Sequence, residues 1–274
     1  MKHIIYIVLF LISLLPMYVL FMFSKIINLS NKFFFYYRYN ITLNNIETSF
    51  PNLKSSQCKE IFQSFYNHFF NIILETIKSL SINKESILKR VKINDLTKLK
   101  SSIKNKKNIV ILCAHYGNWE WLFLRLSLIN NININAIYQK LSNKYFNEII
   151  IKIRTKFGGQ IISSDKWKQF LLKHKTRSTY LFVADQVPQN NINGKRFNFL
   201  NKSTLFHVSP EKTAKLLEAE VYYAEMLIEK TGYYNVNLIK LSSENVTKEY
   251  TKLLEKTIKN KPEYWLWSHN RWKR

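Results

Sequence analysis

His115 and Glu120 are the side chains of this sequence best suited to acid–base chemistry. They belong to the string His115-Tyr-Gly-Asn-Trp-Glu120, which follows an apolar run at 108–114. The run predicts a buried strand, while Asn118 and Glu120 predict the N-cap and first turn of a helix beginning near Trp119. If the histidine lies in the turn and the glutamate in the helix, the carboxylate can orient the imidazole and stabilise the imidazolium. No serine or cysteine accompanies His115 in a nucleophile-elbow context, so the expected proton source is a substrate hydroxyl, without a covalent enzyme intermediate.

Strands and helices are predicted to alternate from residue 108 to the end of the chain. This pattern favours an α/β fold with a mostly parallel central sheet flanked by helices on both faces. The carboxyl ends of strands in such sheets line the ligand-binding crevice, which is where His115 would lie. The predicted strands are 108–114, 134–139, 159–164, 179–185, 221–228 and 233–241, and helices are predicted to begin near Trp119, Asn143, Lys166, Pro210 and Asn245.

The N-terminal segment is predicted to be an uncleaved membrane anchor. Residues 4–23 are almost all apolar, and about 20 residues suffice to cross a bilayer core. No small-residue cleavage site follows, although Pro16 makes a bent or shallow insertion as plausible as a straight span. Aromatic and basic residues at 25–39 are typical of a cytoplasmic membrane interface. We therefore expect an anchor at 1–30 and one domain at 31–274, with a helical part at 31–107 and an α/β catalytic core at 108–274.

The charge of the chain requires an anionic partner. Lys and Arg number 42 against 18 Asp and Glu, which gives a formal net charge of +24. Nucleic acid and an anionic membrane surface are the two obvious classes of partner. The charges are scattered and no nucleic-acid-binding motif is found, so no specific nucleic acid is expected. Cys58 and Cys113 are far apart, which indicates neither a disulfide framework nor a metal site and favours a reducing compartment.

Further polar residues stand where a substrate could meet them. Arg154 ends a predicted helix, where it could grip a phosphate bidentately or simply be solvated. Asp185 and Gln186 close a predicted strand; Asp185 could orient a substrate hydroxyl or a basic residue, or form a turn. Arg271 lies in a closing segment dense in Trp and basic residues, which suits lipid phosphates but also a core cap. No metal site is predicted, because Asp185 has no carboxylate or histidine partner at ligand spacing.

The string at 115–120 resembles the H-x4-D/E motif of the glycerolipid acyltransferase superfamily. More narrowly, it is similar to the lipid A biosynthesis (lauroyl/myristoyl) acyltransferase family, in which the string typically reads His-Phe-Gly-Asn-Trp-Glu. Thr155 stands where relatives often have a second arginine, and Leu200, Asn201 and Ser209 stand where glycines are usual. The resemblance continues in order at Tyr37-Arg38, Asn45-Ile-Glu-Thr-Ser-Phe-Pro51, Glu75-Thr76, Asp185-Gln186 and Trp267-Ser-His269-Asn-Arg271-Trp272. We assign no chemistry to the Glu75-Thr76 pair.

The resemblance implies a membrane-bound acyltransferase that moves a fatty acyl group from acyl carrier protein to a hydroxyl of a lipid A precursor. His115 would be the general base and Glu120 would support its imidazolium. Substrate would be bound by Arg154, Asp185, Gln186, Asn118 and Arg271, with Arg154 on the acceptor's phosphate. The expected partners are acyl carrier protein, a phosphorylated glycolipid and membrane lipids, without a cofactor. The expected location is the inner membrane, with the catalytic domain facing the cytoplasm.

Two other readings remain open from the residues alone. The same His–Glu pair could acylate a lysophospholipid or an aminolipid, with acyl-coenzyme A as a possible donor. A basic, membrane-associated nucleic-acid-binding protein would also carry this charge and these aromatic residues, and it would bind polyanions with strong salt dependence.

Overall fold

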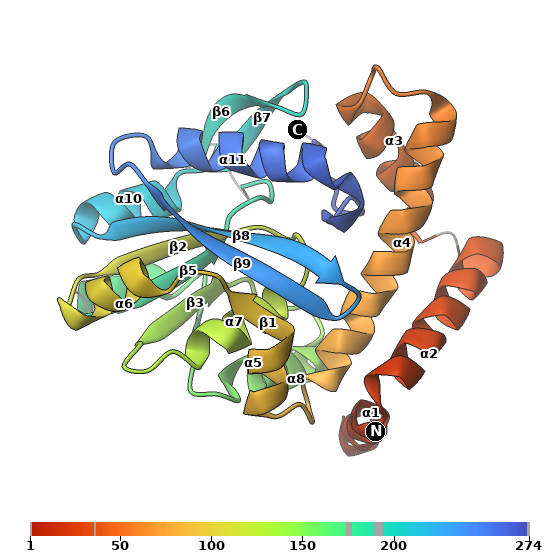
Figure 1. Ribbon diagram of the computed structural model, residues 1–274, viewed down its shortest axis with the longest axis horizontal. Coiled ribbons are helices and arrows are strands. Elements are labelled where there is room, and N and C mark those ends of the chain that lie inside the picture. The colour runs from red at the N-terminus through yellow and green to blue at the C-terminus, as the bar shows by residue number, and fades with distance from the viewer. Residues whose placement is uncertain (1, 36, 174–176, 189–193, 273–274) are drawn as a thin grey trace.

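The computed structural model describes residues 2–35, 37–173, 177–188 and 194–272, and it contains a central seven-stranded sheet (Figure 1). The strand order is β1-β9-β8-β2-β5-β3-β4, and neighbouring strands are parallel except for β8 and β9. The predicted α/β class with a mostly parallel sheet flanked by helices is confirmed. The strands are β1 (Val91–Ile93), β2 (Ile109–Cys113), β3 (Ile134–Tyr138), β4 (Gln160–Ser163), β5 (Thr179–Val183), β8 (Glu220–Lys230) and β9 (Tyr233–Leu241).

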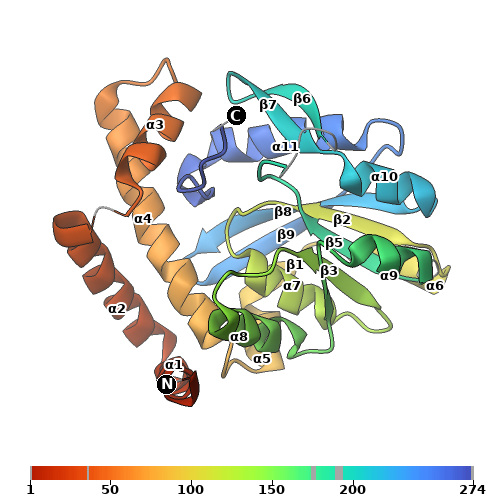
Figure 2. The same ribbon diagram turned by 180° about the vertical axis from the view of Figure 1, so that it is seen from behind.

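Helices cover both faces of the sheet, because its central strands are apolar on both sides. Every residue of β2 is buried, as expected for a strand enclosed by two layers. One core lies beneath α9 (Trp167–Lys173), α10 (Ser209–Leu216) and α11 (Val246–Asn260), and a second beneath α5 (Lys84–Arg90), α6 (Thr97–Lys104) and α7 (Trp119–Ser127). Figures 1 and 2 show α10 and α11 on the opposite side of the sheet from α5 and α7.

Helix α4 (Ser55–Lys78) runs past the edge of the sheet at which β8 ends (Figure 1). Because β2 and β5 run parallel to β8 within the sheet, their carboxyl ends meet the same edge. The aromatic residues Phe65, Tyr66 and Phe70 of α4 are buried in one of the two cores, so this face of the helix packs against the body of the protein. Helix α3 (Tyr39–Ser49) packs on α4, and α8 (Lys144–Thr155) follows β3.

The N-terminal apolar run forms two helices instead of one. Helix α1 (Lys2–Leu14) ends just before Pro16, and α2 (Met17–Ser30) begins after it, because proline cannot continue the hydrogen-bond ladder of α1. Both helices pack on α4, and α2 leads into η1 (Asn31–Phe35). In the described part of the chain no single helix is long and apolar enough to cross a membrane. The helices at 3–14 and 17–33, which are bent by 117° relative to each other, have the length and the apolar composition of a membrane span only when they are taken together.

The structure contains strands that the sequence patterns did not predict. Strand β1 is only three residues long and lies in the part of the chain where only helices were expected. A separate antiparallel hairpin is formed by β6 (Gly194–Phe199) and β7 (Lys202–His207). Its turn consists of Leu200 and Asn201, with φ of 50° and 63°, where glycine is the usual residue in a two-residue hairpin turn. Burial of the Leu200 side chain and a bond from Asn201 Nδ2 to Ser49 O (2.9 Å) hold this turn without glycine.

Candidate active site

His115 and Asp185 are brought together by the register of two neighbouring strands. Cys113 of β2 pairs with Val183 of β5, so the residues two positions beyond each strand end lie side by side. The Asp185 carboxylate accepts from the backbone N–H of His115 (3.1 Å) and lies 2.7 Å from His115 Nδ1. Asp185, one of the predicted substrate-binding residues, is therefore the direct partner of the candidate base.

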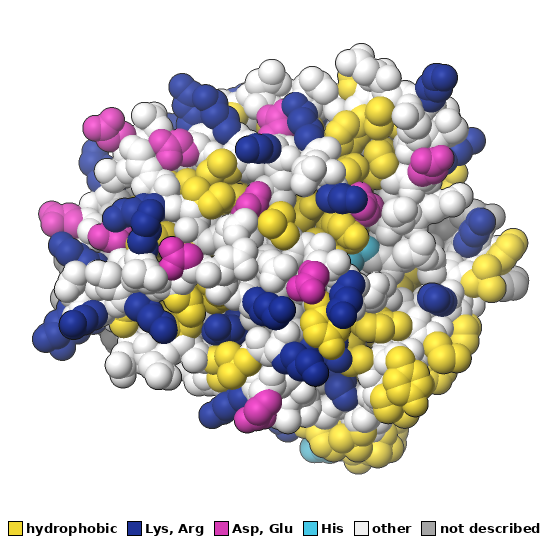
Figure 3. Space-filling view, in the orientation of Figure 1, with side chains coloured by type: hydrophobic (Ala, Val, Ile, Leu, Met, Phe, Trp, Pro, Cys, Tyr) yellow, Lys and Arg dark blue, Asp and Glu magenta, His cyan; other side chains and the backbone are white. Residues whose placement is uncertain are grey.

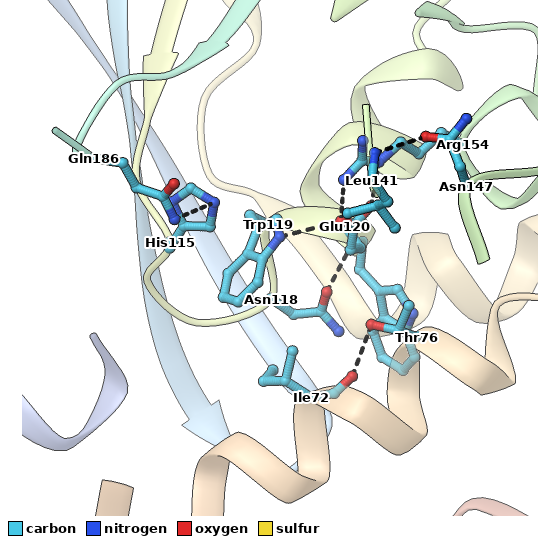
Figure 4. Close-up of polar contacts among 11 residues, drawn as sticks. Ile72, Thr76, His115, Asn118, Trp119, Glu120, Leu141, Asn147, Arg154 and Gln186 are labelled. Carbon is cyan, nitrogen blue, oxygen red and sulfur yellow. Dashed lines mark hydrogen bonds and ion pairs between the residues drawn. The ribbon is translucent and has the colours of Figure 1, made fainter. Parts of the chain in front are cut away.

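The carboxylate of Asp185 is ionised and fixes the imidazole tautomer. Burial alone would raise its pKa, but His115 and the surrounding donors outweigh burial and lower the pKa from 3.8 to about 2. Trp265 Nε1 donates to its second oxygen at 2.8 Å. Because an ionised carboxylate only accepts hydrogen bonds, Nδ1 of His115 carries a proton, and in the neutral imidazole the lone pair is then on Nε2. The predicted residue Gln186 lies next to that lone pair, with its Nε2 at 3.3 Å (Figure 4).

The C-terminal segment holds the turn that carries His115. After η3 (Pro262–Tyr264), the backbone N–H of Leu266 donates to His115 O (3.0 Å), and the N–H of Gly117 donates to Tyr264 O (3.0 Å). Gly117 has a φ of 63°, and a Cβ there would come within 2.8 Å of Met226 Sδ, so the turn requires glycine on two counts. The closing segment thus binds the turn on either side of Tyr116, and Met226 packs against it at Gly117.

Glu120 lies in the first turn of α7 and is bound by Arg154 of α8. The guanidinium donates from Nε to Oε2 (2.8 Å) and from Nη2 to Oε1 (2.6 Å), and Trp119 Nε1 also donates to Oε1 (3.2 Å). Burial would raise the pKa of Glu120, but the charge and hydrogen bonds of Arg154 outweigh it and lower that pKa. Figure 4 shows the Trp119 indole between His115 and Glu120. Within the described residues, the direct carboxylate contact to His115 comes from Asp185 and not from Glu120.

Two other predicted substrate-binding residues lie in the interior. Asn118 is fully buried and caps α7: its Oδ1 accepts from the N–H of Trp121 (2.9 Å), and its Nδ2 donates to Glu75 (2.6 Å). Arg271 is 2% exposed, donates from Nη2 to Leu205 O (2.6 Å) and lies over the ring of Phe206. Of the predicted residues, His115, Asp185 and Gln186 therefore form one group, Glu120 and Arg154 form a second behind Trp119, and Asn118 and Arg271 are buried supports.

Comparison of the sequence with protein families gives a match over the entire chain. The model of the bacterial lipid A biosynthesis acyltransferase family matches residues 1–274. The chain belongs to this family. It is therefore an acyltransferase, and its family acts in lipid A synthesis. Among curated proteins, no significant match to the chain was found.

The candidate site of this acyltransferase also contains residues to which the sequence analysis assigned no role. Trp265 touches the Asp185 carboxylate from a position 80 residues further along the chain. Glu75, which was noted only as part of a family string, binds Asn118 from α4. The density of Trp near the C-terminus was the available signal for Trp265. For Glu75 the signal was a carboxyl residue within an otherwise apolar stretch of helix.

Proposed function

We propose that this acyltransferase transfers a fatty acyl group from acyl carrier protein to a hydroxyl of a phosphorylated lipid A precursor, with His115 as general base. The observation that carries the proposal is the 2.7 Å contact between His115 Nδ1 and Asp185, which makes Nε2 the proton-accepting nitrogen of the neutral imidazole. The His115 side chain is 18% exposed, so a bound hydroxyl can approach Nε2 while most of the ring stays fixed. Asp185, rather than Glu120, would then orient the imidazole and stabilise the imidazolium.

The proposed reaction needs no covalent enzyme intermediate. Nε2 of His115 removes the proton of the acceptor hydroxyl as its oxygen attacks the thioester carbonyl. The tetrahedral intermediate collapses with cleavage of the carbon–sulfur bond, an ester forms, and the departing thiolate takes the proton back from the imidazolium. Gln186 is the neighbouring amide that can hold the acceptor oxygen or the developing oxyanion.

We propose that the Glu120–Arg154 pair binds the phosphate of the acceptor. The Arg154 side chain is 21% exposed, and its Nη1 makes no hydrogen bond to the described residues. Two hydrogen bonds to Glu120 fix the plane of the guanidinium, which reduces the entropy lost when an anion binds. The pair therefore supports the expected role of Arg154 and gives Glu120 a positioning role.

We also propose that α1 and α2 place the enzyme on the cytoplasmic face of the inner membrane. Their outer side chains are large, apolar and exposed, and Figure 3 shows apolar side chains gathered in the region that α1 and α2 occupy in Figure 1. Patches of this kind on a protein surface mark contacts with a membrane or a partner. The exposed residues include Ile4, Ile7, Leu11, Leu14, Met22, Ile26 and Leu29.

The proposal is tested by mass spectrometry of a tetra-acylated lipid A precursor after incubation with the membrane-extracted enzyme and acyl carrier proteins of different chain lengths. We expect the mass of one acyl group to be added with the wild type and not with His115→Ala. If a folded wild-type enzyme adds no mass with any donor, the proposed acceptor or donor is wrong. Lysophospholipid or aminolipid acceptors and acyl-coenzyme A would then be tested in its place.

A further inference from the structure

Glu75 is a carboxyl group buried completely beneath the candidate site. It lies near the end of α4 with no exposed surface. Its Oε2 accepts from Asn118 Nδ2 and from the hydroxyl of Tyr234, both at 2.6 Å, and its Oε1 has no hydrogen-bond partner among the described residues. Burial raises the pKa of Glu75 to about 7. Such a group costs stability, so its presence needs an explanation beyond the fold itself.

The hydrogen bonds of Glu75 converge on the turn that carries the candidate base. Asn118 uses its amide oxygen to cap α7 and its amide nitrogen to reach Glu75, so Glu75 determines which way the Asn118 amide is oriented. The backbone carbonyl of Glu75 also accepts from Trp121 Nε1 at 3.1 Å. Glu75 thus binds both Asn118, the cap of α7, and Trp121 in the first turn of α7. Asn118 lies three residues beyond His115. Figure 4 shows Asn118 directed towards α4, next to Ile72 and Thr76.

We infer that Glu75 is a positioning residue for acyl transfer, acting through Asn118 on the turn from His115 to the start of α7. This inference rests on the proposed role of His115 as general base. Glu75 is the acceptor of the Asn118 amide nitrogen, so its loss leaves the amide held only through the cap bond of its oxygen and removes the tie between the start of α7 and α4. A turn that moves by a fraction of an ångström takes His115 Nε2 out of line with the acceptor hydroxyl.

The contact is a donor–acceptor pair, so it can be exchanged. Asn118→Asp replaces the donating amide by a carboxylate, so the bond is lost where Glu75 is ionised, above its pKa of about 7, and the variants are compared at such a pH. Glu75→Gln turns the partner into a group that can donate. In the double variant Glu75→Gln/Asn118→Asp, the amide nitrogen at 75 stands in the place of Oε2 and donates one N–H to the carboxylate at 118, which still caps α7. Its second N–H donates to the Tyr234 hydroxyl oxygen, whose own hydrogen binds Oε2 in the wild type. The exchange restores the bond with its polarity reversed and leaves the number of carboxyl groups unchanged.

The test is steady-state transfer by the full-length enzyme with the lipid A precursor and acyl carrier protein, together with thermal unfolding of each variant. We expect kcat to fall at least tenfold in Glu75→Met and in Asn118→Asp, with KM for the donor within about twofold, since no substrate contact is removed. Glu75→Gln alone should stay within a few-fold of the wild type, because its amide oxygen can accept in place of Oε2. The double variant should recover most of the kcat lost in Asn118→Asp.

Tyr222→Phe supplies the matched control for stability. It removes a buried tyrosine hydroxyl that donates to the Glu220 carboxylate (3.0 Å) near the amino end of β8, away from the site, and it should lower the melting temperature without lowering kcat. Equal kcat in Asn118→Asp and the double variant, or a folded Glu75→Met with wild-type kcat, would overturn the inference. An inactive wild type would instead overturn the proposed function, so the two failures are distinguishable.

Discussion

Asp185 and Glu120 are the two carboxylates that flank the candidate base, and their surroundings assign them different work. Asp185 contacts His115 directly, whereas Glu120 is held by Arg154. We expect Asp185→Asn to lower kcat about 10²- to 10⁴-fold, because the neutral amide no longer stabilises the imidazolium. Glu120→Gln should mainly raise KM for the phosphorylated acceptor, by about tenfold, because the amide accepts only one of the two guanidinium hydrogen bonds and no longer fixes the plane of Arg154.

Initial rates over a range of acceptor concentrations separate these two effects, and His115→Ala sets the baseline without a general base. The opposite pattern, in which Glu120→Gln lowers kcat strongly and Asp185→Asn does not, would return the orienting role to Glu120. That role is the one expected from the placement of His115 in a turn and Glu120 in the following helix, and from the resemblance of the whole string to the family motif.

The buried carboxyl of Glu75 makes the stability of the fold depend on pH. Its pKa is about 7 in the folded protein against 4.5 ordinarily, so the folded state keeps the proton after the unfolded chain has lost it. The stabilisation from this group is therefore full below about pH 4.5 and is lost as the pH rises to about 7, by about 3 kcal/mol at most. Because Gln does not titrate, urea unfolding should show Glu75→Gln gaining stability relative to the wild type between pH 5 and pH 8. A difference that is constant across this range would mean that Glu75 titrates normally.

Among the elements, the closing segment after α11 ties the C-terminus to the site. Trp265 is 3% exposed and donates to Asp185 Oδ2, a bond that Trp265→Phe removes while keeping most of the packing. We expect a loss of about 1–3 kcal/mol in the free energy of unfolding at pH 7. The pKa of Asp185, which is about 2 in the wild type, should rise towards 3.8, so the stability that this carboxylate contributes above pH 3.8, and that is lost as the pH falls towards the folded-state pKa, should be smaller than in the wild type; kcat should also fall.

Trp267→Phe is the matched change within the same segment. The indole of Trp267 is also buried, but it donates to the backbone carbonyl of Pro262 (2.6 Å) and not to a carboxylate. Urea unfolding and initial rates should therefore show a comparable loss of stability with a smaller loss of kcat. Equal kcat losses in the two variants would mean that the segment acts through packing alone.

The strands and helices of the core could be predicted from sequence because their signals are local. The buried strand at 109–113, the cap at Asn118 and each break in periodicity between elements are signals contained within a few consecutive residues. Asp185 could be placed at the site because it closes a predicted strand, and a contact to a basic residue was one of its expected roles. The roles of Glu75 and Trp265 could not be predicted in this way, since these residues reach the site from elements far away in the sequence. The hairpin β6–β7 was missed because its turn residues, Leu200 and Asn201, lack the glycine that normally marks such a turn.

At the scale of the whole molecule, the exposed apolar side chains and the candidate site lie on neighbouring elements. Helices α1 and α2 pack on α4, and α4 carries Glu75 beneath the candidate site. Lys78, also on α4, donates to Ser13 O (2.8 Å) and Leu15 O (2.9 Å) and so holds the break between α1 and α2. In addition, Lys152 of α8 lies over the ring of Tyr6 at 4.2 Å. A membrane bound by α1 and α2 would thus hold a lipid acceptor close to the sheet edge that bears His115.

This arrangement predicts that membrane binding and catalysis can be separated. Ile7 and Leu11 are 53% and 57% exposed on α1, one helical turn apart, and the double change Ile7→Asn/Leu11→Asn should weaken binding to anionic phospholipid vesicles about 10²- to 10³-fold. Transfer to an acceptor dispersed in detergent should remain near the wild-type rate, because no residue of the site changes. Vesicle sedimentation measures the first quantity and mass spectrometry of the product the second.

The control uses exposed leucines on other elements. Leu172 of α9 and Leu216 of α10 are 65% and 59% exposed, and Leu172→Asn/Leu216→Asn removes a similar apolar area from helices that do not belong to the α1–α2 pair. This variant should sediment with vesicles as the wild type does. If instead it loses binding while the α1 variant keeps it, the membrane contacts a different face, and the approach of the lipid acceptor to His115 must be sought from that side.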